Sequence, residues 1–206
     1  MKIVLFSIIA YLLGSIPSGY LMASNLKNID LRDIGSGNVG ATNVARALGL
    51  KAGLFVAILD ILKGFVAVRI ARVFLPADIS IFVIFIIGLL AIAGHNWSIF
   101  LNFSGGKGVA TTIGVVLEIL PVSFFIFIIC WITLTVLTRY VSLGSLVGAV
   151  SLPISGYIIT NDMIYLLYLL LLTITIFITH KENIIRLKRG NENRMSWPPQ
   201  QRGGNN

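Results

Sequence analysis

Residues 108–137 read GVATTIGVVLEILPVSFFIFIICWITLTVL, and this apolar run decides the fold. Its thirty residues would form a helix of about 45 Å, which exceeds the roughly 30 Å hydrocarbon core of a bilayer. Glu118 and Pro121 interrupt the run near its middle, and proline favours the first turn of a new helix. The run is therefore either one overlong helix or two shorter ones.

Apolar runs of a length suited to spanning a membrane flank this stretch, at 3–24, 52–75, 79–101, 143–160 and 163–179. A transmembrane helix needs about 20 apolar residues. The first run could be a cleaved signal peptide, but its apolar part is too long and no small-residue cleavage site precedes a soluble region. Hydrophobic residues make up 56% of the 206 residues and charged residues 12%, with a mean hydropathy of +0.91, whereas average chains carry about 25% charged residues. We therefore predict an all-α integral membrane protein whose first run is the first span.

The distribution of Lys and Arg separates one helix from two at 108–137. Two helices would give seven spans and place the segments 25–51, 101–107, 138–142 and 180–206 on one side of the membrane. These segments hold twelve of the sixteen Lys and Arg residues, namely Lys27, Arg32, Arg46, Lys51, Lys107, Arg139, Lys181, Arg186, Lys188, Arg189, Arg194 and Arg202. The opposite turns carry Asp78, Glu118 and Asp162 but no Lys or Arg. Because Lys and Arg concentrate in cytoplasmic loops, we predict seven spans, with the N-terminus outside and the C-terminus in the cytoplasm.

Some residues fit this topology less simply. The fourth span, roughly 107–119, is short for a crossing, so we expect neighbouring helices to shield it from lipid. Arg69 and Arg72 lie near the outer end of the second span, where we expect them to snorkel to the membrane surface. Asp60 and Lys63 stand three apart in the same span and predict an ion pair that supports helix packing.

The net charge and the cysteine count exclude some functions. The chain carries a formal charge of +8 and a single cysteine, Cys130. In a membrane protein this excess indicates the membrane surface or anionic substrates, and we predict no binding of nucleic acid. One cysteine allows neither an internal disulfide nor a Cys-rich metal site. We expect one domain at 1–194 and a polar, disordered tail at 195–206.

Most residues of chemical interest lie in three clusters on the predicted cytoplasmic side. The first, at 35–49 (GSGNVGATNVARALG), joins a glycine-rich loop to a short helix that carries Arg46. Backbone N–H groups in such a loop bind anions, and Arg46 adds a fork for phosphate or carboxylate. The alternative is a flexible loop at the membrane surface, although the Ser, Asn and Thr residues between the glycines favour a site.

The second and third clusters each contain one of the two histidines. The second combines 94–97 (GHNW) with 104–108 (SGGKG), at the start of the fourth span, where the helix dipole favours an anion. The third consists of 180–183 (HKEN) and 190–192 (GNE). We expect His95 to be a hydrogen-bonded structural residue, whereas structural and catalytic roles are equally open for His180. We assign Arg186, Lys188 and Arg189 to a solvated basic tail.

Several familiar catalytic signatures are absent from the sequence. Neither His95 nor His180 begins an H-x-x-x-x-D motif, which marks the acyl-CoA-type glycerolipid acyltransferases. The sequence also lacks a G-x-S-x-G elbow and an H-E-x-x-H zinc motif. We therefore expect neither a metal nor an organic cofactor.

Together, the three clusters resemble the cytoplasmic motifs of the bacterial PlsY family, the acyl-phosphate:glycerol-3-phosphate acyltransferases. The stretches that carry the resemblance are 34–49 (IGSGNVGATNVARALG), 94–111 (GHNWSIFLNFSGGKGVAT) and 180–192 (HKENIIRLKRGNE). The shorter stretches 60–64 (DILKG) and 139–145 (RYVSLGS) extend it. Three long motifs in the same order are far more specific than any single glycine loop. The resemblance covers nearly the whole chain up to about Arg194.

The resemblance implies transfer of a fatty acyl group from acyl phosphate to the 1-position of glycerol 3-phosphate, which yields lysophosphatidic acid and phosphate. It also implies a multi-pass protein of the bacterial inner membrane with a cytoplasmic active site, which contacts membrane lipid and receives long-chain acyl phosphate from a soluble enzyme. Ser36 and His180 are the residues expected to be catalytic. The residues expected to bind substrate are Gly37, Asn38, Asn43, Arg46, His95, Asn96, Ser104, Gly105, Gly106, Lys107, Gly108, Ser142, Asn183 and Glu192.

The sequence leaves the mechanism and two rival functions open. Because acyl phosphate is already activated, we expect direct attack by the glycerol hydroxyl, without an acyl-enzyme on Ser36. The proton goes either to His180 or to a phosphate oxygen of a bound substrate, and the second alternative is slightly favoured. A transporter of phosphorylated metabolites is the main rival function, but we find no internal repeat of the kind that transporters contain. A purely structural membrane scaffold would leave the three clusters unexplained.

Overall fold

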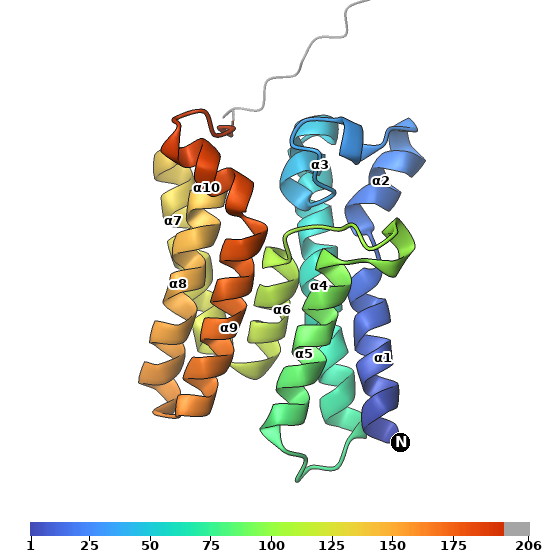
Figure 1. Cartoon of the computed structure of the whole chain (residues 1–206), viewed down its shortest axis with the longest axis vertical. Coiled ribbons are helices and arrows are strands. Elements are labelled where there is room, and N and C mark those ends of the chain that lie inside the picture. Colours follow the sequence, from blue (N-terminus) through green and yellow to red (C-terminus); the bar gives the residue numbers. More distant parts are fainter. Residues whose placement is uncertain (196–206) are drawn as a thin grey trace, which may run out of the picture.

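The computed structural model describes residues 1–195, and within them all regular elements are helical (Figure 1). Residues 196–206, most of the predicted tail, lie outside the described residues. The α-helices are α1 (Lys2–Ser15), α2 (Ser18–Lys27), α3 (Ala41–Leu48), α4 (Leu50–Phe74), α5 (Ile81–Asn96), α6 (Val109–Ile119), α7 (Pro121–Thr138), α8 (Val141–Thr160), α9 (Met163–Thr179) and α10 (Lys181–Lys188). Two short 3-10 helices, η1 (Leu31–Asp33) and η2 (Ile99–Leu101), lie in the loops. The predicted all-α class is confirmed.

The stretch 108–137 contains two helices. α6 ends at Ile119, and Leu120 has extended backbone angles (φ −148°, ψ 78°). Pro121 then occupies the first turn of α7, where its missing N–H has no cost and its fixed φ suits the helix. The proline therefore divides the run.

Two predicted spans have different bounds in the structure. The run 3–24 is not one helix, because the chain breaks at Ile16–Pro17 between α1 and α2. Proline lacks the N–H that a continuous helix needs and restricts the residue before it. The run 79–101 is helical only from Ile81 to Asn96, after which the Ser98 hydroxyl accepts the Phe100 N–H and begins η2. Such local hydrogen bonds compete with helix continuation.

The outer surface of the bundle is apolar. Large side chains such as Leu137 and Ile158, each 76% exposed, face outwards, and a soluble monomer rarely exposes so much apolar area. Three helical segments, 2–27, α7 and α8, are long and apolar enough to cross a membrane, and the bent pair α9–α10 makes a fourth. α5 and α6 are shorter apolar helices, and α4 has 25 residues but carries several charges.

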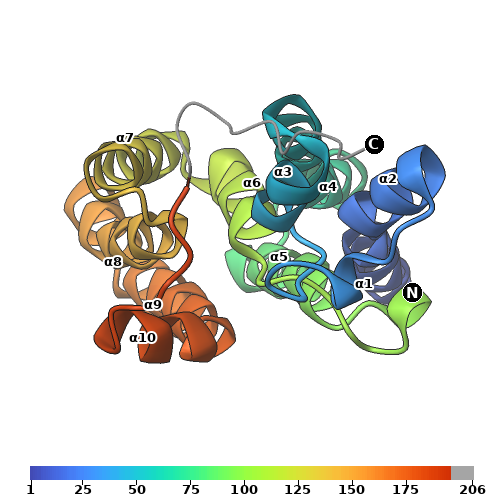
Figure 2. The ribbon, with the colours of Figure 1, turned by 90° about the horizontal axis from the view of Figure 1, so that it is seen from above.

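α6 lies between two groups of helices. Seen from above, α1–α5 lie on one side of it and α7–α10 on the other (Figure 2), and α6 packs against α4, α5 and α7. Its contact with α4 is close, because a Cβ on Gly114 would lie 2.0 Å from the carbonyl oxygen of Ile61, and one on Gly64 2.2 Å from that of Thr111. Small residues allow such helix contacts in membranes. Most of α6 is buried, so the short fourth segment is shielded as predicted.

The charged residues of α4 have partners. The predicted Asp60–Lys63 ion pair is present, with 2.8 Å between Lys63 Nζ and Asp60 Oδ1. Arg69 and Arg72, predicted to snorkel to the membrane surface, extend to Glu118 of α6, with Nη1–Oε1 distances of 3.3 and 3.9 Å. The sequence could not indicate this contact, because Glu118 lies more than forty residues away and becomes a neighbour only when α6 packs on α4.

Candidate active site

The three sequence clusters lie at the same end of the bundle, the upper end in Figure 1. There, α3, the start of α6 and the region of α10 border a cavity of about 320 Å³. Helices α4, α7 and α8 and the end of α5 also contribute to its lining. The cavity has a polar rim and an apolar interior, and each part is built from different elements.

Asn43 organises the loop before α3. Its buried amide donates from Nδ2 to the carbonyl oxygens of Leu31 at 3.1 Å and Ile34 at 2.8 Å, and Oδ1 accepts the N–H of Ser36 at 3.1 Å. Gly35 has a φ of +64°, and a Cβ there would lie 2.3 Å from Asn43 Oδ1. One side chain from α3 thus holds the loop so that Ser36 borders the cavity.

The loop between α5 and α6 lies directly on the end of α5. The N–H of Gly106 donates to the carbonyl oxygen of His95 at 3.0 Å. A Cβ on Gly106 would lie 2.0 Å from His95 Nε2, and one on Gly108, which has a φ of +77°, would lie 2.4 Å from Asn96 Oδ1. Backbone packing therefore requires glycine at both positions, and this packing sets the place of Lys107.

His180 stands where the chain bends by 64° between α9 and α10. Its Nδ1 lies 2.8 Å from the carbonyl oxygen of Ile176, and because a carbonyl only accepts, the proton is assigned to Nδ1 and the lone pair to Nε2. Burial lowers the pKa of His180 from 6.5 to about 4, and the nearby charge of Lys107 acts in the same direction. The imidazole is therefore neutral at physiological pH.

Glu192 is the centre of a hydrogen-bond network at the rim. Its Oε1 accepts from Asn183 Nδ2 at 2.8 Å and from Ser142 Oγ at 3.2 Å, and its Oε2 accepts from Arg186 Nε at 2.8 Å. Lys107 Nζ donates to Asn183 Oδ1. The Glu192 side chain is only 3% exposed, and a buried carboxylate needs such partners. The network joins α8, α10 and the loop before α6.

Two cations, Lys107 and Arg46, line the cavity, and they differ in their partners. Burial lowers the pKa of Lys107 from 10.5 to about 8, with the charge of Arg186 in the same direction and that of Glu192 opposed. Arg46 reaches the cavity from α3, and within residues 1–195 its guanidinium has no hydrogen-bond or ion-pair partner. The rim therefore offers an anion one lysine held by Asn183 and one free arginine fork.

The interior of the cavity is apolar. Side chains from α4, α6 and α7 line it, namely Leu54, Ala57, Ile58, Ile61, Val109, Ala110, Ile113, Phe127, Ile128 and Trp131. Two of them, Leu54 and Ile58, are each 54% exposed, so one wall of the cavity also belongs to the outer surface of the bundle. A ligand with an anionic head and an apolar tail matches these two parts.

The cavity brings together most of the predicted site residues. Those that line it are Ser36, Asn38, Asn43, Arg46, His95, Lys107, Gly108, Ser142, His180, Asn183 and Glu192. The others, Gly37, Asn96, Ser104, Gly105 and Gly106, are not among its lining residues, and some of these shape the loops behind it. Within residues 1–195, no three His, Cys, Asp or Glu side chains gather closely enough to hold a metal ion.

One residue that the sequence predicted to lie in a solvated basic tail belongs to the rim network. The side chain of Arg186 is only 30% exposed and pairs with Glu192. One sequence signal could have found it, because Arg186 follows Asn183 by three residues and therefore shares its helix face. Thr42, one of the polar residues among the glycines of the first cluster, also lines the cavity, as does Asn193, which no pattern in the sequence distinguished.

Comparisons with known proteins agree with each other. A family described as glycerol-3-phosphate acyltransferase matches residues 4–190. The glycerol-3-phosphate acyltransferase of a Thermoanaerobacter species is 43% identical over 95% of this chain and 96% of its own, and that of Thermus thermophilus is 42% identical over 91% and 92%.

Two crystal structures are similar to this chain. They show PlsY, an integral membrane glycerol 3-phosphate acyltransferase, in its glycerol 3-phosphate form and its lysophosphatidic acid form. The first has a TM-score of 0.88 and 40% identity, covering 95% of this chain and 96% of that chain. The second has a TM-score of 0.86 and 38% identity, covering 97% and 98%.

We predict that Glu192→Ala loosens the rim. Asn183 and Arg186 would lose their shared acceptor, and a hydrogen bond to a charged group contributes about 1.5–3 kcal/mol to the free energy of unfolding. Thermal unfolding in detergent and amide hydrogen exchange across 181–195 measure the loss. Glu182→Ala, which removes an exposed carboxylate from α10, the helix of Asn183 and Arg186, is the matched control. Equal effects of the two variants would contradict the prediction.

Proposed function

Because the chain belongs to the glycerol-3-phosphate acyltransferase family, we propose that its cavity joins glycerol 3-phosphate to an acyl group carried by acyl phosphate. The chain is an integral membrane acyltransferase, as its relatives and its similar structures are. These comparisons support no role in transport. The donor, the roles of individual residues and the orientation in the membrane belong to the proposal.

The two-part cavity is the observation that carries the proposal. Its rim offers Arg46 and Lys107 to phosphate groups, while its interior offers a wall of aliphatic and aromatic side chains to an acyl chain. Because α4 contributes both to this wall and to the exposed apolar surface, an acyl chain can enter from the bilayer without crossing water. A water-soluble second substrate would reach the polar rim.

We assign the phosphate of glycerol 3-phosphate to Lys107 and Arg46, with Ser36 as a hydrogen-bond donor. Ser36 Oγ borders the cavity and, within residues 1–195, has no hydrogen-bond partner. Asn183 would hold the Lys107 ammonium in place, and Glu192 would hold Asn183. Asn43 shapes the Ser36 loop with all its bonds made to the backbone, which supports a positioning role beside the predicted binding role.

The proposed reaction is a direct transfer. The 1-hydroxyl oxygen of glycerol 3-phosphate attacks the acyl carbonyl carbon, the bond from this carbon to the phosphate oxygen breaks, and phosphate leaves with its electron pair. The hydroxyl proton is lost to a base, and the products are lysophosphatidic acid and inorganic phosphate. Since the donor is a mixed anhydride, orientation and charge neutralisation are the main tasks of the protein.

We assign the proton to a phosphate oxygen of a bound substrate. His180 is buried and its pKa of about 4 makes it a weak base, whereas a phosphate monoester has a second pKa of about 6. His180 Nε2 can still accept a hydrogen bond from the glycerol hydroxyl, because Nδ1 keeps the ring in that tautomer. In this mechanism His180 orients the nucleophile and Ser36 stays unacylated.

The donor prediction separates this enzyme from its alternatives. Purified protein should release phosphate only when long-chain acyl phosphate and glycerol 3-phosphate are both present, and acyl-CoA should not replace the donor. Lysophosphatidic acid formed from acyl-CoA and glycerol 3-phosphate, without acyl phosphate, would refute the donor, and an acyl group trapped on Ser36 would refute direct transfer.

Lys107→Ala should lower kcat/KM for glycerol 3-phosphate by roughly ten- to a hundredfold, since one charge-assisted contact is lost.

The pKa values predict the pH dependence. Lys107 binds phosphate only when protonated, and its pKa of about 8 means that kcat/KM for glycerol 3-phosphate should fall as the pH rises through about 8. Lys107→Arg keeps its charge in this range, so the alkaline decline should disappear in that variant, even if its rate is lower. An unchanged alkaline decline in Lys107→Arg would assign the ionisation to another group.

We also propose seven spans, with the N-terminus outside and the site on the cytoplasmic face of the bacterial inner membrane, open to a soluble enzyme that makes acyl phosphate. The cation distribution supports this orientation. In cells that carry a Cys130→Ser background, Asn191→Cys should react with an impermeant thiol reagent only after permeabilisation. Asp78→Cys should react in intact cells. The reverse labelling pattern would overturn the orientation.

A further inference from the structure

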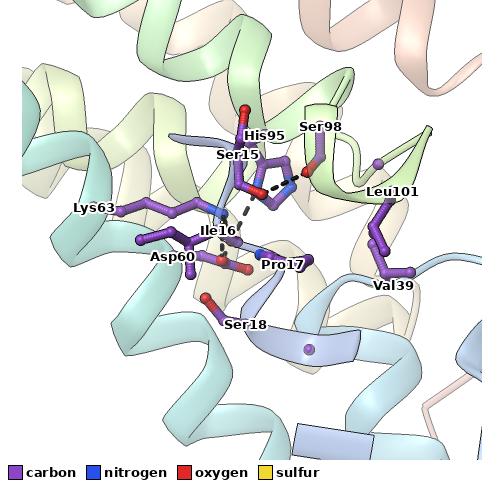
Figure 3. A pocket seen from close by; sticks show the side chains of 12 residues that line it. Ser15, Ile16, Pro17, Ser18, Val39, Asp60, Lys63, His95, Ser98 and Leu101 are labelled. Carbon is purple, nitrogen blue, oxygen red and sulfur yellow. Dashed lines mark hydrogen bonds and ion pairs between the residues drawn. The ribbon is translucent and has the colours of Figure 1, made fainter. Parts of the chain in front are cut away.

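A second polar cluster lies deeper in the bundle than the rim network. It consists of Asp60 and Lys63 of α4 and His95 of α5 (Figure 3). Lys63 Nζ is 2.8 Å from Asp60 Oδ1, and His95 Nδ1 is 3.7 Å from the same oxygen. Lys63 also donates to the carbonyl oxygen of Ile16, at 2.9 Å. The cluster therefore joins α4, α5 and the break between α1 and α2.

Burial of these ionisable side chains costs free energy, because they lose their hydration. Asp60 is 2% exposed, and Lys63 and His95 are each 8% exposed. Apolar side chains of similar volume often stabilise a protein as well as a buried ion pair does, and ionisable residues within membrane helices are usually functional. Helix packing alone therefore does not account for these three residues.

A small cavity couples His95 to Asp60. It measures about 10 Å³ and lies among Ser15, Asp60, Lys63 and His95 (Figure 3), which is close to the space that one water molecule requires. Ser15 Oγ and His95 Nδ1 are buried there without a hydrogen-bond partner in the described part of the chain, and Asp60 Oδ1 has only the Lys63 ammonium as an ion-pair partner. The cavity places these polar atoms around room for one water molecule, which could bond to His95 Nδ1 and to the Asp60 carboxylate.

The other side of the His95 ring supports the loop that carries Lys107. Gly106 packs so closely on the ring that a Cβ there would lie 2.0 Å from Nε2, and its N–H donates to the His95 carbonyl oxygen. The next residue of the loop is bonded to α9, because the Lys107 carbonyl oxygen accepts a hydrogen bond from Thr179 Oγ1 at 3.0 Å. A tilt of the imidazole would therefore move the loop relative to α9 and to the rim.

We propose that Asp60, Lys63 and His95, bridged by one water molecule, form a positioning network that sets the loop at 104–108 and so aims Lys107 at the phosphate of glycerol 3-phosphate. The inference rests on the proposed function of Lys107. It gives Asp60 and Lys63 a role in substrate affinity that packing does not require. Asp60 and His95 line both cavities, whereas Lys63 lines only the small one. An effect of Lys63 on kinetics therefore does not come from contact with substrate in the large cavity.

The test replaces the ion pair by apolar residues of similar size, in Asp60→Leu/Lys63→Met. The variant should stay folded, with a thermal midpoint in detergent equal to or above that of the wild type. Its KM for glycerol 3-phosphate should rise, with kcat/KM falling roughly ten- to a hundredfold as expected for a misplaced binding group, while KM for acyl phosphate stays unchanged. A folded variant with wild-type kinetics would overturn the proposal.

The matched control replaces Glu118 and one of its two arginine partners, in Arg69→Met/Glu118→Leu at the opposite end of α4. This variant should leave both KM values unchanged. If it raises KM for glycerol 3-phosphate as much as the first variant does, the effect is a general loosening of α4 and the proposal fails. Wild-type enzyme that lacks acyltransfer from acyl phosphate would instead refute the proposed function.

His95→Gln tests whether the ion pair acts through the imidazole. Because Asp60 is proposed to act through His95, adding Asp60→Leu/Lys63→Met to His95→Gln should lower kcat/KM no further than the more severe of the two changes. Conversely, Asp60→Glu should restore most of the affinity that Asp60→Asn loses. Fully additive losses, or an Asp60→Glu variant as weak as Asp60→Asn, would overturn the coupling.

Discussion

A charged group within a bilayer must either be paired or reach water, because no other arrangement offsets its loss of hydration. This constraint explains the internal contacts that organise the helices. Glu118 joins α6 to the two arginines of α4 at one end of the bundle. At the other end, the Glu192 network ties the last segment to α8 and to the loop before α6. The buried charged side chains thus make specific contacts between helices, while the outer surface of the bundle is apolar.

The glycines of the site let the loop backbone lie close to the end of α5, and this role is as important as anion binding. Gly106 and Gly108 lie against His95 and Asn96 so closely that a side chain at either position would collide with them. The end of α5 therefore shapes the loop. Lys107 is held by two contacts, from its carbonyl oxygen to Thr179 and from its ammonium to Asn183. A preorganised cation of this kind loses less conformational entropy on binding phosphate than a free lysine does.

The chemistry that this architecture supports requires little from the side chains as acids or bases. In the proposed reaction the acyl phosphate is already activated, and both proposed substrates would bring phosphate groups to Lys107 and Arg46. His180 and Asn183 are buried and held by other protein groups, which suits the orientation of a nucleophile. The apolar interior and the exposed apolar side chains of α4 would let a long acyl chain remain in an apolar environment throughout.

The sequence alone determined the helical class, the division of 108–137 at Pro121 and most of the rim residues, because these follow from hydrophobic length, proline geometry and motifs that are continuous in the chain. Only the tertiary structure decided which distant residues meet. The contact of Arg69 and Arg72 with Glu118 and the meeting of His95 with the Asp60–Lys63 pair both join separate segments. Helix packing selects these partners. Hydropathy and spacing report how each segment folds, but they carry no information on the direction in which a side chain of one helix faces another.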